Sequence, residues 1–331
     1  MSRELKDQSR WEVGDEGAEG LMRCDLHVHS WYSGAADLPV LRHMGRECYS
    51  EPAAVYEQAV RRGMDLVTLT DHDSIEGALE LRGLPDTFVS EEVTVVLPGD
   101  RQLHVNVFDV SEAQHGRIQA LRADPEALFA YLAEERIPAS VNHLFSSLTG
   151  ERAVPDLRLP VGRLPLIEAL NGSMPEAHNE RARRVGRAVG MGAVGGSDSH
   201  TLSGVGRAYT TVAGARTREE FLEGLRRGLT VPCGRSGSYA RLTAEVVRIF
   251  AAAYRDAARE AWKEGRGTRA LLALALLPLL PAIPLVTVAI HAHEARFGAR
   301  QFRAFQKAFG WPAERPSIAG DLAPLRSLGQ A

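Results

Sequence analysis

The middle of the chain alternates between short apolar runs and longer mixed segments. The apolar runs are typical of buried strands and predict strands at 66–70, 94–97, 103–110, 139–141, 166–170 and 193–195. Apolar spacing and capping residues predict helices among them at 51–63, 124–136, 175–190 and 217–228. Strand and helix therefore follow one another repeatedly, which predicts an α/β fold built on a parallel sheet or barrel.

The stretch Asp25-Leu26-His27-Val28-His29 opens the folded region as an extended segment. Side chains alternate along a strand, so Asp25, His27 and His29 share one face. Far along the chain, Gly196-Ser197-Asp198-Ser199-His200 repeats this spacing with an acid and a histidine. Paired histidines also occur in half-exposed strands, so either segment alone leaves a structural role open.

Other polar residues occupy equivalent places, within a predicted strand or just after it. Six of the 11 histidines do so, together with two acids: His27, His29, His72, His104, His143, His200, Glu92 and Asp198. The ends of parallel barrel strands converge on one face, where active sites are built. Imidazole and carboxylate without thiolate suit Zn²⁺, Mn²⁺ or Fe²⁺. A buried, hydrogen-bonded histidine is the commoner role for any one of them, but the whole set predicts a metal cage.

The ordered motifs resemble those of the PHP family, named for polymerase and histidinol phosphatase. The resemblance runs from about Arg23 to Cys233 and rests on these segments: Asp25-Leu26-His27-Val28-His29, Leu69-Thr70-Asp71-His72-Asp73, Glu92-Val93-Thr94, His104, Asn142-His143 and Gly196-Ser197-Asp198-Ser199-His200. It implies a distorted (βα)7 TIM-like barrel that hydrolyses phosphate esters. Two or three divalent ions would lie at the C-terminal ends of its strands.

The resemblance also assigns ligands position by position. The first ion would be held by His27, His29, Glu92 and Asp198. The second ion would be held by Glu92, His104 and His143, and a third by His72 and His200.

The sequence departs from the family pattern in the loop after the first histidine pair. Relatives carry an Asp or a His there as the remaining ligand of the third ion. Here the loop reads Tyr32-Ser33-Gly34-Ala35-Ala36-Asp37, so Asp37 is one candidate and His43 a weaker one. The choice between a dinuclear and a trinuclear site stays open.

The chemistry expected of such a site is metal-assisted hydrolysis of a small phosphorylated substrate. Asp198 and His200 are the candidate catalytic residues within the cage. Arg207, just beyond them, is a candidate phosphate contact, although a solvated loop arginine is the plainer reading. Asp71 could orient a ligand imidazole. Glu168 and Asn171 could line the pocket, although a strand-end Glu paired with an arginine fits as well.

Two other functions fit parts of the pattern. A barrel that binds metal but has lost catalysis could act as a membrane-tethered scaffold or regulator. A barrel with a histidine pair and a late aspartate could also hydrolyse a C–N bond. Enzymes of that second kind often need a carboxylated lysine, and no lysine occurs between Lys6 and Lys263.

The charge and the cysteine content of the chain limit its possible binding partners and its cellular compartment. The net charge is −3 and the pI about 6.4, so no global basic field attracts nucleic acid. Cys24, Cys48 and Cys233 are widely spaced and form no paired motif, which favours a reducing compartment. The first twenty residues are acidic and polar, so we expect no signal peptide and a cytoplasmic protein.

The composition divides the chain into three parts. We expect a polar leader at 1–21, the catalytic barrel at 22–238 and a helical, partly hydrophobic tail at 239–331. Residues 270–290 carry no charge, and about 20 apolar residues can cross a bilayer. Three prolines interrupt this run, so it either spans a membrane, with the barrel on the inner face, or folds back as a hairpin onto the protein or a second copy.

Overall fold

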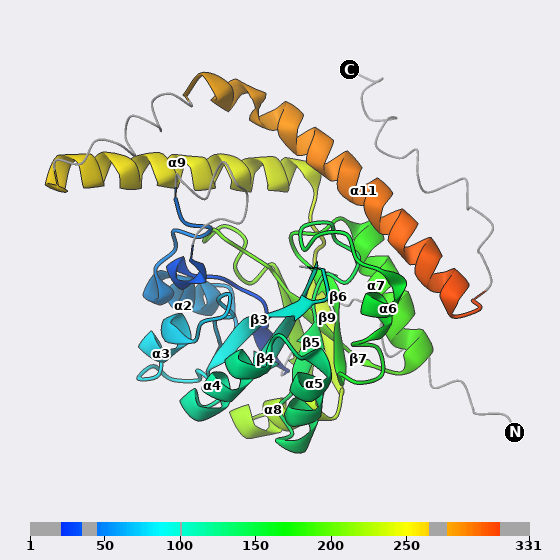
Figure 1. Cartoon of the computed structure of the whole chain (residues 1–331). Helices are drawn as coiled ribbons and strands as arrows, with labels where there is room; N and C mark the ends of the chain where they lie inside the picture. The colour runs from blue at the N-terminus through cyan, green and yellow to red at the C-terminus, as the bar shows by residue number, and fades with distance from the viewer. Residues whose placement is uncertain (1–20, 35–44, 100, 265–276, 312–331) are drawn as a thin grey trace, which may run out of the picture.

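The computed structural model describes residues 21–34, 45–99, 101–264 and 277–311 (Figure 1). Its strands form two sheets. The first has the order β2 (Leu66–Val67), β1 (Met22–Asp25), β8 (Ala208–Val212), β9 (Thr230–Gly234). The second has the order β3 (Ser90–Leu97), β4 (Arg101–Phe108), β5 (Ala139–Val141), β6 (Leu166–Asn171), β7 (Gly192–Gly196).

The α/β class is as predicted, but the described strands do not form the expected closed (βα)7 TIM-like barrel. β1 and β2 are parallel, as are β5, β6 and β7. The other pairs, β3 with β4, β4 with β5, β1 with β8 and β8 with β9, are antiparallel. The connection between β3 and β4 is too short for the crossover that parallel strands require, so they form a hairpin. Isolated bridges, including His72 to Glu92 and Val28 to Ser199, link segments of different strands near their ends.

Helices pack around the two sheets, and their ends follow the capping residues. The α-helices described before the C-terminal region are α2 (Pro52–Arg61), α3 (Glu76–Glu80), α4 (Glu112–Leu121), α5 (Pro125–Glu134), α6 (Val154–Arg158), α7 (Glu176–Val189) and α8 (Arg218–Arg226). Asp124 caps α5 by accepting from the Ala127 N–H at 3.1 Å. Gly190 ends α7 in the left-handed region at φ 76°. The sequence prediction missed α3, α4 and α6, and it placed Glu92 before β3 rather than within it.

In the C-terminal region the described elements are α9 (Tyr239–Glu264), the 3₁₀ helix η3 (Leu277–Ala282) and α11 (Ile283–Ala308). The predicted helical tail is therefore present, and α11 is part of the main core. Phe302 and Phe305 are buried, and the Phe302 ring lies 5.3 Å from that of Phe145. The Tyr239 hydroxyl donates to the Pro284 carbonyl at 2.8 Å, where α9 and α11 cross.

The proposed membrane span at 270–290 finds no support in the described residues. Residues 270–276 lie outside them, and 277–290 form η3 and the first turns of α11. Among the described residues, no helix combines the length and the apolar character needed to cross a bilayer.

Candidate metal centre

Glu92 lies at the centre of a buried cluster of imidazoles. It projects from β3 with no solvent exposure. Its Oε2 atom lies 3.1 Å from His27 Nε2, 3.5 Å from His29 Nε2 and 3.3 Å from His72 Nδ1. One carboxylate oxygen thus faces three histidines from two segments that are distant in the sequence.

The other oxygen of Glu92 faces a second group. Its Oε1 atom lies 3.3 Å from both His104 Nδ1 and His143 Nε2. The Asn142 side-chain amide donates to the same oxygen at 2.8 Å. Glu92 can therefore bridge two cations, one at each oxygen, as the family resemblance implies.

Asp198 completes the first group from the segment after β7. Its Oδ1 atom lies 3.5 Å from His27 Nε2 and 3.4 Å from His29 Nε2. Its backbone N–H donates to the His27 carbonyl at 2.6 Å, which joins the two motifs directly. Gly196 permits this approach, because a Cβ there would lie 2.3 Å from the Cβ of His27.

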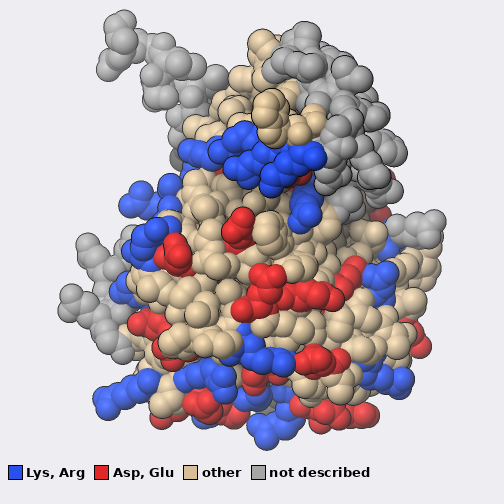
Figure 2. All heavy atoms as spheres, turned by 90° about the vertical axis from the view of Figure 1, so that its left-hand side faces the viewer, with Lys and Arg blue, Asp and Glu red and all other residues tan. Residues whose placement is uncertain are grey.

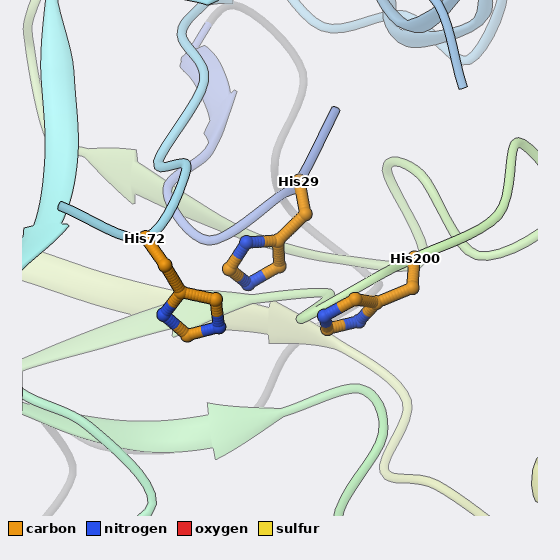
Figure 3. Close-up of side chains that lie close together, drawn as sticks. All are labelled: His29, His72 and His200. Carbon is orange, nitrogen blue, oxygen red and sulfur yellow. The ribbon is translucent and has the colours of Figure 1, made fainter. Parts of the chain in front are cut away.

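A third cluster comprises His29, His72 and His200, whose rings converge in Figure 3. The His29 ring centroid lies 4.7 Å from that of His72 and 4.3 Å from that of His200. Glu47 reaches both outer histidines, with Oε2 3.5 Å from His72 Nε2 and Oε1 3.4 Å from His200 Nε2. Glu47 is therefore a candidate for the remaining ligand that the resemblance implies for a third ion.

The sequence prediction missed Glu47 and named Asp37 and His43 instead. Both of those residues lie outside the described part of the chain. Glu47 lies in the same long loop after the first histidine pair, so widening the search to any acid in that loop would have found it.

All eight predicted ligands lie in this one cluster, although they come from distant parts of the chain. Two of them have strained backbones, with φ 26° at His143 and φ 50° at Asp198. Side chains other than glycine rarely adopt positive φ, and such strain persists where surrounding contacts hold it. The contacts around the cluster supply that restraint.

Glu168 supports the cluster from β6. Its Oε1 lies 2.8 Å from His27 Nδ1, so Nε2 of that ring is left to face the cluster. Its Oε2 accepts from the His143 backbone N–H and from the Asn171 side chain, both at 2.9 Å. Asn171 also donates to Asp198 at 2.9 Å. The predicted pocket residues Glu168 and Asn171 thus orient ligand side chains.

Asp71 orients His29 through a serine rather than directly. The Ser33 hydroxyl donates to Asp71 Oδ1 at 2.8 Å and lies 2.9 Å from His29 Nδ1. Asp71 also accepts from the Ser30 N–H and hydroxyl. This chain of contacts fixes the His29 ring with Nε2 toward the cluster.

The C-terminal helix α11 holds the loop that carries His143. Glu294 is buried on α11, and its carboxylate accepts from the Ser147 N–H at 3.0 Å and from the Ser147 hydroxyl. The loop residue Phe145 packs on α11 as well. The position of His143 therefore depends on a helix almost 150 residues away in the sequence.

The acids of the cluster are held ionised despite their burial. Burial alone would raise the pKa of Glu92, but the imidazoles of His27, His104 and His72 keep that pKa well below its usual range. The pKa of Asp198 is likewise lowered, because His27, His29 and other imidazoles outweigh its burial. Two acids thus stay negatively charged where cations would bind.

The histidines of the third cluster titrate very differently. Burial and the neighbouring His200 lower the pKa of His29 to about 3. Glu47 raises the pKa of His200 to about 9 against the effect of its burial. Burial would raise the pKa of Glu47, but the neighbouring imidazole of His200 lowers it to about 2. His29 is thus neutral and available as a metal ligand.

The donor atoms fit divalent cations. His29 Nε2, His104 Nδ1 and His200 Nε2 are buried, face carboxylates and make no hydrogen bond. Unpaired buried nitrogens are costly, whereas coordination to a cation would satisfy them. The three cysteines of the chain are free and buried, and none is grouped with the cluster in the described residues.

The side chain of Arg207 is hydrogen-bonded to its own loop rather than to a residue of this cluster. Its Nε donates to the Ser203 carbonyl at 2.7 Å and the side chain is exposed. Arg62 and Arg241 are close enough that Arg207, after burial, contributes to lowering the pKa of each. A role in phosphate binding stays a prediction.

Replacing Glu47 with Gln is expected to weaken binding of one divalent ion per chain by at least about tenfold, because the ligand loses its charge. Elemental analysis after dialysis measures the number of ions retained. Glu57→Gln, at an exposed position on α2, is the control and should change nothing. Equal metal content in both variants would remove Glu47 from the site.

A family model described as PHP-associated matches residues 176–230. The matched segment extends from the start of α7 to the start of β9 and contains Asp198 and His200. An uncharacterized protein of Methanocaldococcus jannaschii is 33% identical over 72 residues, which are 22% of this chain and 41% of that protein. The match thus spans less than half of that relative's length.

Two solved structures align with the chain at low sequence identity. A two-domain protein from Bacteroides vulgatus, containing a predicted PHP-like metal-dependent phosphoesterase, aligns with a TM-score of 0.48 and 18% identity, covering 71% of this chain and 70% of that one. PsfC from Pseudomonas syringae aligns with a TM-score of 0.49 and 16% identity, covering 69% of this chain and 97% of that one.

Proposed function

We propose that the chain is a metal-dependent phosphoesterase of the PHP type that hydrolyses a small phosphorylated substrate, and the PHP-associated model that matches residues 176–230 supports this proposal. The observation that carries the proposal is the buried cluster, in which Glu92 lies within 3.5 Å of five imidazoles that come from four separate segments. A nitrogen and oxygen donor set of this kind suits Mn²⁺, Zn²⁺ or Fe²⁺.

When bound, divalent cations lower the pKa of a coordinated water and neutralise charge that develops on phosphoryl oxygens. The contribution of the chain is to hold the donor atoms in place before substrate arrives. Glu168 fixes the ring of His27, and Ser33 fixes that of His29. Asn142 fixes the carboxylate of Glu92.

Differences in burial indicate the side from which substrate enters. The side chains of His27, His29 and Glu92 are at most 1% exposed. Those of His200 and Glu47 are 18% and 24% exposed. Substrate would therefore approach from the side of the third cluster.

The phosphate group would be held by guanidinium groups near that side. Arg207 follows the Asp198 and His200 motif, and Arg62 and Arg241 lie close to it. Arg62 and Arg207 both donate to the Ser203 carbonyl, at 2.8 and 2.7 Å. Guanidinium groups bind phosphate oxygens in a bidentate manner, so we assign substrate binding to Arg207.

The test is phosphate release by the purified full-length chain from p-nitrophenyl phosphate and a panel of phosphorylated metabolites. Hydrolysis is expected to disappear after treatment with EDTA and dialysis, and to return with Mn²⁺ or Zn²⁺. Tightly bound metal without hydrolysis of any phosphoester would instead favour the catalytically silent module. Hydrolysis that resists chelation would contradict the proposed function.

A further inference from the structure

The outer face of α9 gathers positive charge. Arg248, Arg255, Arg259 and Lys263 are all exposed, and spacings of seven and four residues place them on one side of a helix. Every exposed charged residue of α9 whose side chain is described is a cation. Trp262 lies on the same side and is 91% exposed. We call this set the cationic face.

The last turns of α9 project beyond the body of the protein. In Figure 1 the helix extends past α2 and every other described element on that side. Among the side chains of α9 that are described, Ala257 is the last buried one, and Trp262 and Lys263 beyond it are exposed. Figure 2 views this side and shows arginine and lysine side chains gathered near the top of the molecule.

Exposed apolar side chains also gather at the other end of α9, where the first turns of α11 pack on its first turns. Leu285, Val286 and Val288, in the first turns of α11, are 73%, 53% and 48% exposed. Thr287 pairs with Thr243 of α9 at 2.7 Å, and Val247, one turn further along α9, is 46% exposed. Six of the nine large hydrophobic residues described as exposed belong to α9 or α11. A concentration of this kind marks an interaction surface.

We propose that the cationic face of α9 and the first turns of α11 bind the surface of an anionic lipid bilayer. Arginine and lysine would contact lipid phosphates, while Trp262 and Leu285 would enter the interface. Since no described helix can cross a bilayer, the helices would lie along its surface.

The chemistry of this surface favours lipid over two other partners. A second copy of the chain would bring one cationic face against another, which like charges oppose. Nucleic acid would satisfy the cations but offers no apolar phase for Leu285, Val286 and Val288. An anionic bilayer provides both kinds of contact.

Sedimentation of the full-length chain with phosphatidylcholine vesicles, with and without phosphatidylglycerol, tests the proposal. Binding is expected only with phosphatidylglycerol and should weaken as salt is added. The triple variant Arg255→Glu, Arg259→Glu, Lys263→Glu should lose affinity by at least about a hundredfold, since each basic residue contributes about fivefold. Leu285→Ser should also weaken binding, at unchanged charge.

A matched control reverses three arginines elsewhere on the surface: Arg61, Arg82 and Arg136, whose side chains are 62%, 58% and 72% exposed. It has the same net charge as the test variant and should bind vesicles as the wild type does. The proposal is overturned if the wild type does not sediment with anionic vesicles, or if the two triple variants lose affinity equally. It is also overturned if the cationic-face variant still binds vesicles as the wild type does, and its effect is instead to dissociate a dimer in analytical ultracentrifugation or to abolish binding to a single-stranded oligonucleotide.

Discussion

Replacing Glu92 with Gln is expected to remove bound metal from the centre and to lower kcat for phosphoester hydrolysis at least about a thousandfold. Both oxygens of this carboxylate face imidazoles, so its charge is shared by the two proposed cation sites. Metal-ion catalysis supplies several kcal/mol of barrier lowering, and a thousandfold is about 4 kcal/mol. Elemental analysis and steady-state rates measure the two effects.

The neighbouring residue provides a control of the same type. Glu91 is equally buried but points away from the cluster, where it accepts from Gln119 at 2.7 Å and lies 2.9 Å from His115 Nδ1. Glu91→Gln should lower stability by about 1–2 kcal/mol through its weakened hydrogen bonds, and should keep the metal. If Glu92→Gln retained full metal content and full rate, Glu92 would have no place in the centre.

Replacing Phe305 with Ala is expected to destabilise the whole protein by about 3–5 kcal/mol. Phe305 is fully buried on α11, and its ring contacts those of Phe145, Phe309 and Trp311. Its loss would leave a cavity in the core beside the loop that carries His143. Urea unfolding measures the change in stability, and metal titration of the folded variant should show weaker binding at the site that includes His143.

Leu285→Ala provides the comparison on the same helix. Leu285 is 73% exposed, so its removal should change the free energy of unfolding by less than about 0.5 kcal/mol. If Phe305→Ala changed the free energy of unfolding as little as Leu285→Ala and left metal binding unchanged, α11 would be an independent appendage instead of part of the core.

The sequence was sufficient to predict which side chains meet, because the motifs constrain local geometry. His27 and His29 lie on one face of an extended segment, and Asp198 and His200 follow the same rule. Both segments follow directly after a strand. Because the ends of the strands of an α/β fold lie on one face, the pattern predicts that the two segments meet there. The PHP-associated family model matches residues 176–230, which contain Asp198 and His200, so it supports the resemblance for that part of the chain.

The parts that could not be predicted depend on contacts between distant segments. Glu47 lies in a loop without regular periodicity, and only folding brings it to His72 and His200. The support from Glu294 is hidden in the sequence because a buried acid on an amphipathic helix looks like any surface acid. The uncharged run at 270–290 has the length of a membrane span. Its composition does not show that α11, a helix that packs on the core, begins within this run at Ile283.

Anomalous diffraction from crystals grown with Mn²⁺ tests the central claim most directly. The account predicts one peak among His27, His29, Asp198 and Glu92, and a second at the other oxygen of Glu92 beside His104 and His143. Each peak should lie at coordination distance, about 2.0–2.3 Å, from its ligand atoms. Crystals that contain Mn²⁺ elsewhere, with these side chains paired only to one another, would contradict it.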